Sequence, residues 1–280
     1  MTEINDRSSY RAPAAWRPAR FAAAAVLLLA LAALAAFVTG TASGALHVLV
    51  YAAAVAPGLP VGRRLFGRHP LALPAGAAVG YGLSCLAAWT VVKSGHPSPA
   101  AFVSAWVALS AATLFCCGGG WRARRAPLLA LPPWGAGHTA GLACVLALVA
   151  VLMAVPYRGV GVTDAAGDRL YRAYFTADFW WHMALTAELA RFEMPPVNPY
   201  LAPERMHYYW TYFLVPAATV GAGPGELASP EVVLKVNALC TALLFAATIF
   251  GLAWCGVKRS WALLGGVLLV TFASSAEGLY

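Results

Sequence analysis

The chain has few charged residues. Only 11% of its 280 residues are Asp, Glu, Lys or Arg, whereas a soluble globular protein has about 25%. Hydrophobic residues make up 61%, so the composition excludes an ordinary soluble domain and indicates an integral membrane protein. The net charge of +8 does not indicate nucleic-acid binding, because the basic residues form small clusters between apolar segments.

Cysteine pairs of the CxxC type are absent. The six cysteines lie in or at the ends of apolar segments, where small buried thiols are common. We therefore predict neither a disulfide framework nor a zinc site. Asp164 and Asp168 are not spaced as a tight metal motif, so we predict no cofactor and no obligatory metal, and we leave a divalent ion open.

Long apolar runs make up most of the chain. A helix needs about 20 mainly apolar residues to cross a membrane. Seven runs are candidates: 21–38, 47–61, 71–92, 100–117, 139–155, 232–256 and 261–273. The second is short and contains Pro57 and Pro60, and the last is also short. The expected fold is all-α, a multi-pass transmembrane helical bundle with about seven spans.

Clusters of arginine predict how the chain is oriented. One cluster follows the second run and another follows the fourth: Arg63, Arg64, Arg68; Arg122, Arg124, Arg125. Because Lys and Arg are concentrated on the cytoplasmic side, we expect both clusters and the N-terminus in the cytoplasm. Residues 157–231 then form one long loop outside the cytoplasm.

This topology divides the chain into two regions. Residues 1–138 form an N-terminal membrane region with four spans. Residues 139–280 contain a span, the outer loop 157–231 and two further spans. The apolar run 208–220 is only about 13 residues long, so we expect it to lie at the membrane interface. Because the chain stops soon after an apolar run, one interpretation is a truncated piece of a longer polypeptide.

The outer loop concentrates groups suited to acid–base chemistry. It holds eight of the eleven acidic residues: Asp164, Asp168, Asp178, Glu188, Glu193, Glu204, Glu226 and Glu231. Residues 177–192 lack Gly and Pro, which predicts an interfacial helix of about four turns. Thr176 or Asp178 is suited to cap it. Asp178 and His182 are four residues apart and therefore share one face of this helix.

Each candidate residue has two interpretations. Asp178 is either a helix cap or a catalytic or substrate-orienting carboxylate. His182 is either an interfacial residue that pairs with Asp178 or a group that takes part in the reaction. Asp164 and Asp168 lie in a Gly-containing turn, where solvated loop charges are common.

Basic and aromatic residues follow further along the loop. Arg205 and His207 are candidates for binding a phosphate, or for contact with lipid headgroups. The next residues, Tyr208, Tyr209 and Trp210, suit either an aromatic belt at the membrane surface or stacking on a sugar.

Taken together, residues 139–280 resemble the GT-C class of membrane glycosyltransferases. They are most similar to the branch with protein O-mannosyltransferases and aminoarabinose transferases, and to related bacterial multi-pass families. In that class a span precedes an outer loop with an early acidic residue, surface helices, a Pro-containing segment and a Tyr/Trp-rich helix. A span ending in a basic cluster follows. The corresponding features are 139–155; Asp164, Asp168 and Asp178; Pro195-Pro196; 207–212; and 232–256 with Lys258-Arg259.

The resemblance is one of order, with two departures: four spans precede the matching part, and no Asp-Glu pair is present. It implies transfer of a sugar from a polyprenyl-phosphate donor to an acceptor, at the outer face of a bacterial plasma (inner) membrane. The implied partners are that lipid-linked sugar and membrane lipids. The implied catalytic residues are Asp178, then Asp164 and Asp168, with His182. The implied substrate-binding residues are Arg172, Arg205, His207, Tyr208, Tyr209 and Trp210.

Two other classes of protein remain possible from the sequence. One is a transporter of a lipid-linked substrate, and the other is a non-catalytic membrane scaffold or assembly subunit. An ion-coupled transporter usually has charged residues inside its spans. Lys235 and His47 come nearest to this, and both are close to the ends of apolar runs.

Overall fold

The computed structural model describes residues 16–118, 127–129, 131–171, 178–207, 210–223, 229–257 and 260–272. The chain is mostly helical. Its elements are α1 (Trp16–Thr39), α2 (Ser43–Val55), η1 (Ala56–Gly58), α3 (Leu59–Phe66), α4 (Ala72–Lys93), α5 (Pro99–Gly118), α6 (Ala136–Gly159), β1 (Val162–Thr163), β2 (Arg169–Leu170), α7 (Phe179–Leu189), η3 (Thr211–Phe213), α8 (Leu214–Ala222), α9 (Pro230–Gly256) and α10 (Ser260–Phe272).

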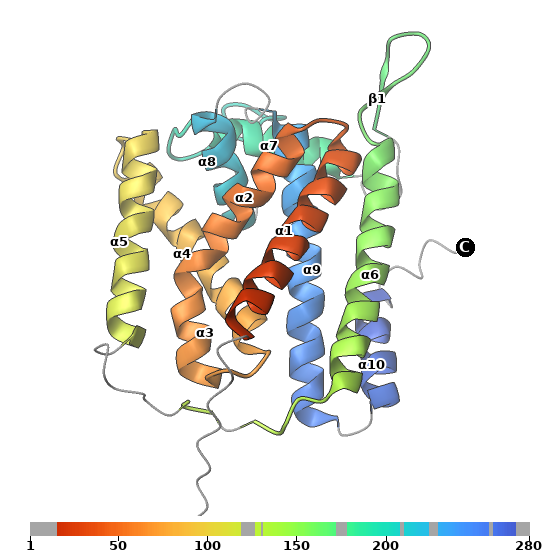
Figure 1. The fold of residues 1–280 in the computed structure, drawn as a ribbon. Helices are drawn as coiled ribbons and strands as arrows, with labels where there is room; N and C mark the ends of the chain where they lie inside the picture. The colour runs from red at the N-terminus through yellow and green to blue at the C-terminus, as the bar shows by residue number, and fades with distance from the viewer. Residues whose placement is uncertain are drawn as a thin grey trace, which may run out of the picture.

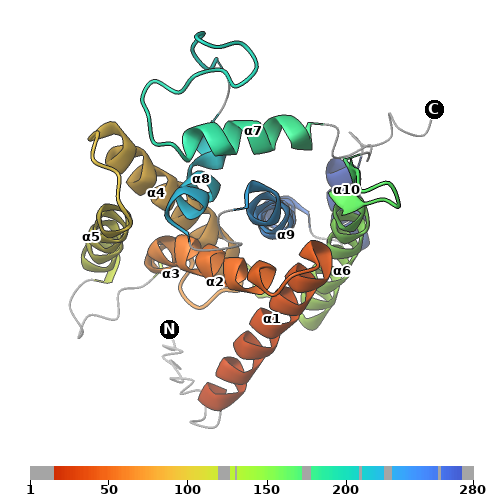
Figure 2. The same ribbon diagram turned by 90° about the horizontal axis from the view of Figure 1, so that it is seen from above.

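The long helices run side by side and form a bundle (Figure 1). Helix α9 lies near its centre, and packs against α1, α2, α4, α6, α7, α8 and α10 (Figure 2). Its 27 residues include Val233, Val236 and Ala246, which are fully buried. A long apolar helix that is buried on several sides is the natural core of a helical membrane protein.

Five helical segments of the described chain are long and apolar enough to cross a membrane. They are Ser43–Phe66, Ala72–Lys93, Pro99–Cys117, Ala136–Gly159 and Pro230–Gly256. Shorter apolar helices cover Ala25–Thr39 and Thr211–Ala222, and α10 has 13 residues. The expected multi-pass helical membrane protein is confirmed at this level, and the expected total of about seven spans stays a prediction.

The segment with two prolines is one continuous bent span. Helices α2 and α3 are joined by the single 3-10 turn η1. Pro57 is tolerated at the start of this turn because a backbone N–H there would have no partner within the helix, and proline has no N–H. This span crosses α4 at very close range. A Cβ atom on Gly58 would collide with the backbone of Gly76 and Gly80, and one on Gly80 would collide with the carbonyl of Val55. Glycine here permits the backbone contact that holds the two spans together.

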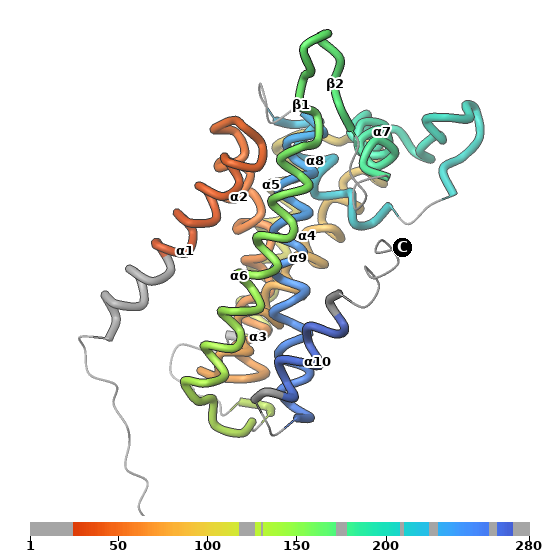
Figure 3. The backbone as a smooth tube through the Cα atoms, turned by 90° about the vertical axis from the view of Figure 1, so that its right-hand side faces the viewer, coloured from red at the N-terminus to blue at the C-terminus, as the bar shows by residue number. Residues whose placement is uncertain are grey.

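The bundle has two different ends (Figure 1). Helix α3 ends, and α4 and α6 begin, at the end that carries Arg63 and Arg64 in the last turn of α3. At the opposite end, called the outer end below, lie the hairpin β1–β2, α7 and α8. Figure 3 shows the hairpin extending past the end of α6. Helix α7 covers most of the helix expected at 177–192, and η3 with α8 covers most of the apolar run 208–220.

The close crossing generates a prediction about stability. Replacing Gly80 with Val should destabilise the protein by about 1–3 kcal/mol, because the added side chain must force α4 away from the Val55 carbonyl. Thermal unfolding of the purified protein in detergent measures this effect. Gly82→Val is the matched control, since a Cβ there meets no atom within 4 Å. Equal unfolding temperatures for the two variants would contradict the close crossing.

Candidate active site

A cavity of about 250 Å³ lies at the outer end of the bundle. It is lined by residues of α6, α7, η3 and α9: Tyr157, Phe179, His182, Tyr212, Phe213, Leu234 and Ala238. The walls are mainly aromatic and aliphatic, and His182 is the one imidazole among them. Such a cavity suits a ligand with a substantial apolar surface that is held in place by a few polar contacts.

The sequence of α7 explains why His182 faces this cavity. Phe179, His182, Thr186 and Leu189 recur at helical spacing, so they lie on one face. Phe179, Thr186 and Leu189 are buried against the bundle, and His182 is half-buried. The ring centroid of His182 lies 5.1 Å from that of Phe213. Burial of the apolar side chains of α7 therefore makes the side chain of His182 point into the cavity.

Two opposing effects set the protonation state of His182. Burial lowers its pKa below the ordinary value of 6.5, and the negative charge of Asp178 partly raises it again. The backbone N–H of His182 donates to the carbonyl oxygen of Asp178 at 2.9 Å, in the first turn of α7. With a lowered pKa the imidazole is mainly neutral at pH 7, and a neutral imidazole can accept a proton.

The Tyr212 part of the cavity wall is held by a buried polar contact. The hydroxyl of Tyr81 in α4 lies 3.1 Å from both the backbone oxygen of Tyr212 and Oδ1 of Asn237 in α9. Asn237 is fully buried. Burial also raises the pKa of the Tyr212 hydroxyl to about 12, so this phenol stays protonated near neutral pH. Residues of α4 and α9 thus fix the position of η3.

The predicted acidic residues are not gathered in one place. Asp178 is exposed at the N-cap position of α7, beside His182, but its side chain makes no capping hydrogen bond. Asp164 lies in the turn of the hairpin, where Oδ1 accepts the N–H groups of Ala166 and Asp168, both at 2.9 Å. Its role there is to stabilise the turn. Neither Asp164 nor Asp168 lines the cavity.

The predicted substrate-binding residues are also dispersed. Arg205 and His207 are exposed, and the backbone of Arg205 forms a β-bridge with Val197. Trp210 packs its ring against Trp89, with centroids 4.7 Å apart. None of these three lines the cavity. Arg172, Tyr208 and Tyr209 lie outside the described residues.

The carboxylates and histidines do not form a metal-binding group in the described chain. No set of three or more His, Cys, Asp or Glu side chains is placed to hold a metal ion within the described ranges.

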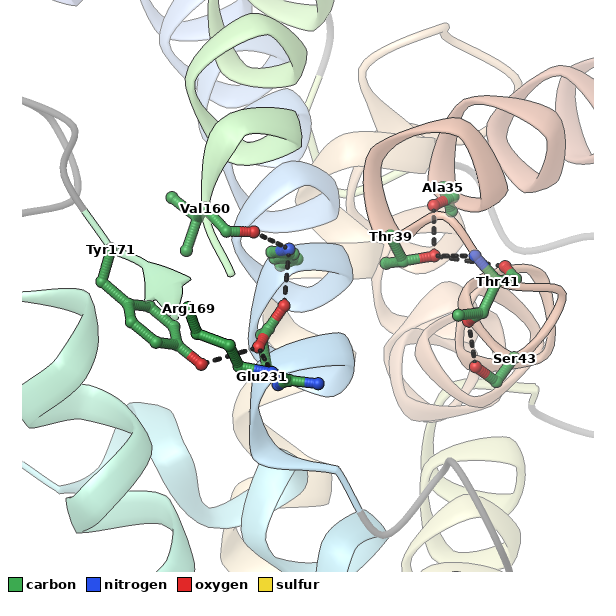
Figure 4. A network of polar contacts seen from close by, with 9 residues as sticks. Ala35, Thr39, Thr41, Ser43, Val160, Arg169, Tyr171 and Glu231 are labelled. Atoms are coloured by element: carbon green, nitrogen blue, oxygen red, sulfur yellow. Dashed lines mark hydrogen bonds and ion pairs between the residues drawn. The ribbon is translucent and has the colours of Figure 1, made fainter. Parts of the chain in front are cut away.

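A network of charged and polar groups surrounds Glu231 at the start of α9 (Figure 4). It was not predicted from the sequence. Nζ of Lys235 donates to Oε1 of Glu231 at 2.8 Å and to the backbone oxygen of Val160 at 2.6 Å. Oε2 of Glu231 accepts from the hydroxyl of Tyr171 at 3.0 Å and from Nη1 of Arg169 at 3.1 Å. The side chain of Lys235 is only 3% exposed. The sequence feature that could have indicated this network is the spacing of four residues between Glu231 and Lys235 at the start of a span.

The contact between Asp178 and His182 generates a prediction. Asp178→Asn should lower the pKa of His182 further, because it removes the charge that stabilises the imidazolium. The pKa can be followed by NMR of the imidazole protons in detergent micelles, with the His182 signal assigned from a His182→Gln variant. Asp164→Asn is the control and should leave this pKa unchanged. An unchanged pKa in both variants would mean that Asp178 does not act on His182.

Comparisons with other proteins leave the family of the chain open. No protein-family model matches the chain, and no curated protein and no solved structure matches it either. The similarity to membrane glycosyltransferases therefore stays a hypothesis based on the order of features in the sequence.

Proposed function

We propose that the chain is a membrane glycosyltransferase that moves a sugar from a polyprenyl-phosphate donor to an acceptor hydroxyl at the outer face of the membrane. The observation that carries this proposal is the placement of His182. It lines an aromatic cavity at the outer end of the bundle, its pKa is lowered by burial, and a carboxylate acts on it from the preceding turn.

Because His182 lines the cavity and Asp178 does not, His182 replaces Asp178 as the first candidate for the catalytic base. Transfer to a hydroxyl requires a group that accepts the hydroxyl proton as the new glycosidic bond forms. The leaving group is a phosphate, which needs little help from an acid. His182 lines the cavity and is suited to accept the proton. Asp178 does not line it, and its role in the proposal is to stabilise the imidazolium ion that forms.

The walls of the cavity suit a lipid-linked sugar. The rings of Tyr157, Tyr212 and Phe213 offer faces for packing against a sugar or an isoprenoid chain. The apolar surfaces of the surrounding spans can hold the remainder of the polyprenyl tail. Contact with the phosphate stays assigned to the basic residues that the sequence suggests, Arg172, Arg205 and His207.

The proposed orientation follows from the distribution of charge. The outer end lies opposite the end of the bundle at which α3 finishes, with Arg63 and Arg64 in its last turn. Arginine near the end of a span favours the cytoplasmic side. The proposal therefore places the cavity at the outer face of a bacterial plasma membrane, with the N-terminus in the cytoplasm.

A transporter of a lipid-linked substrate is the second candidate. His47 is fully buried in the span that begins at Ser43, and within the described residues neither of its ring nitrogens has a hydrogen-bond partner. Buried ionisable residues inside spans are often functional in transporters. A transporter would move the lipid-linked sugar without breaking its bond to phosphate, so an assay of sugar transfer separates the two functions.

The proposal predicts a specific pattern of activity. The purified protein in lipid vesicles should transfer radiolabelled sugar from at least one of a panel of polyprenyl-phosphate-linked sugars. His182→Gln should reduce the rate by about 100-fold or more, because a general base contributes about that factor. Asp178→Asn should reduce it by a smaller factor.

The control for this assay is Asp164→Asn, which alters only the turn of the hairpin and should retain the parent rate. Full activity of His182→Gln would show that the cavity histidine is not the base. If the parent transfers no sugar from any donor in the panel, the transporter or scaffold function is favoured instead.

A further inference from the structure

We infer that Glu231 is a positioning residue for the His182 cavity: its carboxylate joins the end of α6, the hairpin β1–β2 and the chain before α7 to α9. The inference rests on the proposed function for the chemical importance of His182. The claim that Glu231 positions α7 can be tested without any assay of sugar transfer.

The first connection runs through one oxygen of the carboxylate to α6. Oε1 of Glu231 accepts from Lys235, which also donates to the backbone oxygen of Val160 at the end of α6. Val160 is 1% exposed and packs in the same hydrophobic cluster as Phe179 and Leu234, both of which line the cavity. The ion pair therefore holds one side of the cavity wall against α9.

The second connection runs through the other oxygen toward α7. Oε2 of Glu231 accepts from the hydroxyl of Tyr171 at 3.0 Å. The ring of Tyr171 packs edge-on against that of Trp180, with centroids 5.1 Å apart. Trp180 lies in the first turn of α7, directly after the cavity residue Phe179. The carboxylate is thus linked through a single side chain to the helix that carries His182.

The backbone beside the carboxylate leaves it little room to move. Gly161 has φ +72°, and a Cβ atom added there would collide with the carboxylate of Glu231. The N–H of Gly161 donates to the carbonyl oxygen of Leu170 at 2.6 Å, which closes the base of the hairpin. Glu231 is therefore packed directly against the backbone that joins α6 to β1.

The charges explain why this position requires a carboxylate. Lys235 is 3% exposed, and Glu231 is its only ion-pair partner in the described chain. A buried ammonium that loses its counter-ion is strongly unfavourable, so it must move toward water. Such a movement would break the contact with Val160 and loosen the wall formed by α6. Arg169 alone would not have this effect, because its side chain is 63% exposed.

The test compares His182 in the parent with His182 in variants of Glu231. NMR titration of the full-length protein in detergent micelles reports the pKa of His182 directly. Glu231→Gln should raise it toward the ordinary value of 6.5, because a loosened cavity wall admits water to the imidazole. Glu231→Asp should restore part of the difference. Tyr171→Phe, which removes one hydrogen bond, should shift the pKa in the same direction by less.

Glu193→Gln is the matched control. Glu193 also forms an ion pair with an arginine, Arg191, at 3.2 Å, but its side chain is 64% exposed. Its replacement should leave the pKa of His182 at the parent value. If Glu231→Gln and Tyr171→Phe both keep the parent pKa while retaining the parent helix content, the positioning role is wrong. Tyr171→Phe decides the question alone if Glu231→Gln does not fold.

The result does not depend on whether the proposed function is correct. A shifted pKa together with no sugar transfer by the parent would support the positioning role and contradict the glycosyltransferase. An unshifted pKa together with transfer that depends on His182 would contradict the positioning role alone.

Discussion

The ion pair between Glu231 and Lys235 is the interaction on which the outer end of the protein depends. Lys235 is buried and Glu231 is half-buried at the start of a membrane-spanning helix, and such charges are tolerated only when each has partners. Here the partners come from three other segments: Val160 after α6, Arg169 in the hairpin and Tyr171 before α7. Satisfying the charges therefore requires these segments to gather around the beginning of α9.

The remainder of the bundle is held together by different forces. Toward the C-terminal end of α9 the contacts are apolar, and where the span Ser43–Phe66 crosses α4 they are backbone contacts that only glycine permits. Neither kind of packing offers groups for chemistry. Polar groups accumulate where α9 reaches the outer end, and the cavity with His182 lies beside them. The position of the candidate site thus follows from where buried polar groups can be paired.

Local patterns in the sequence were sufficient to predict much of the fold. Apolar runs located the main spans, and the helix expected at 177–192 corresponds to α7. The site itself depends on contacts between distant segments. Lys235 and Val160 are 75 residues apart, and Tyr171 and Glu231 are 60 apart, so no local pattern indicates either pair. Asp164 looked like a candidate base, and only the structure shows that its carboxylate holds a turn.

The pH dependence of sugar transfer tests the central claim most directly. If neutral His182 accepts the proton of the acceptor, kcat/KM should rise with pH and level off, with a midpoint below 6.5. In Asp178→Asn the midpoint should fall further, because the carboxylate no longer favours the imidazolium. A rate that is constant between about pH 5 and 8, or a midpoint that is the same in both proteins, would contradict the account.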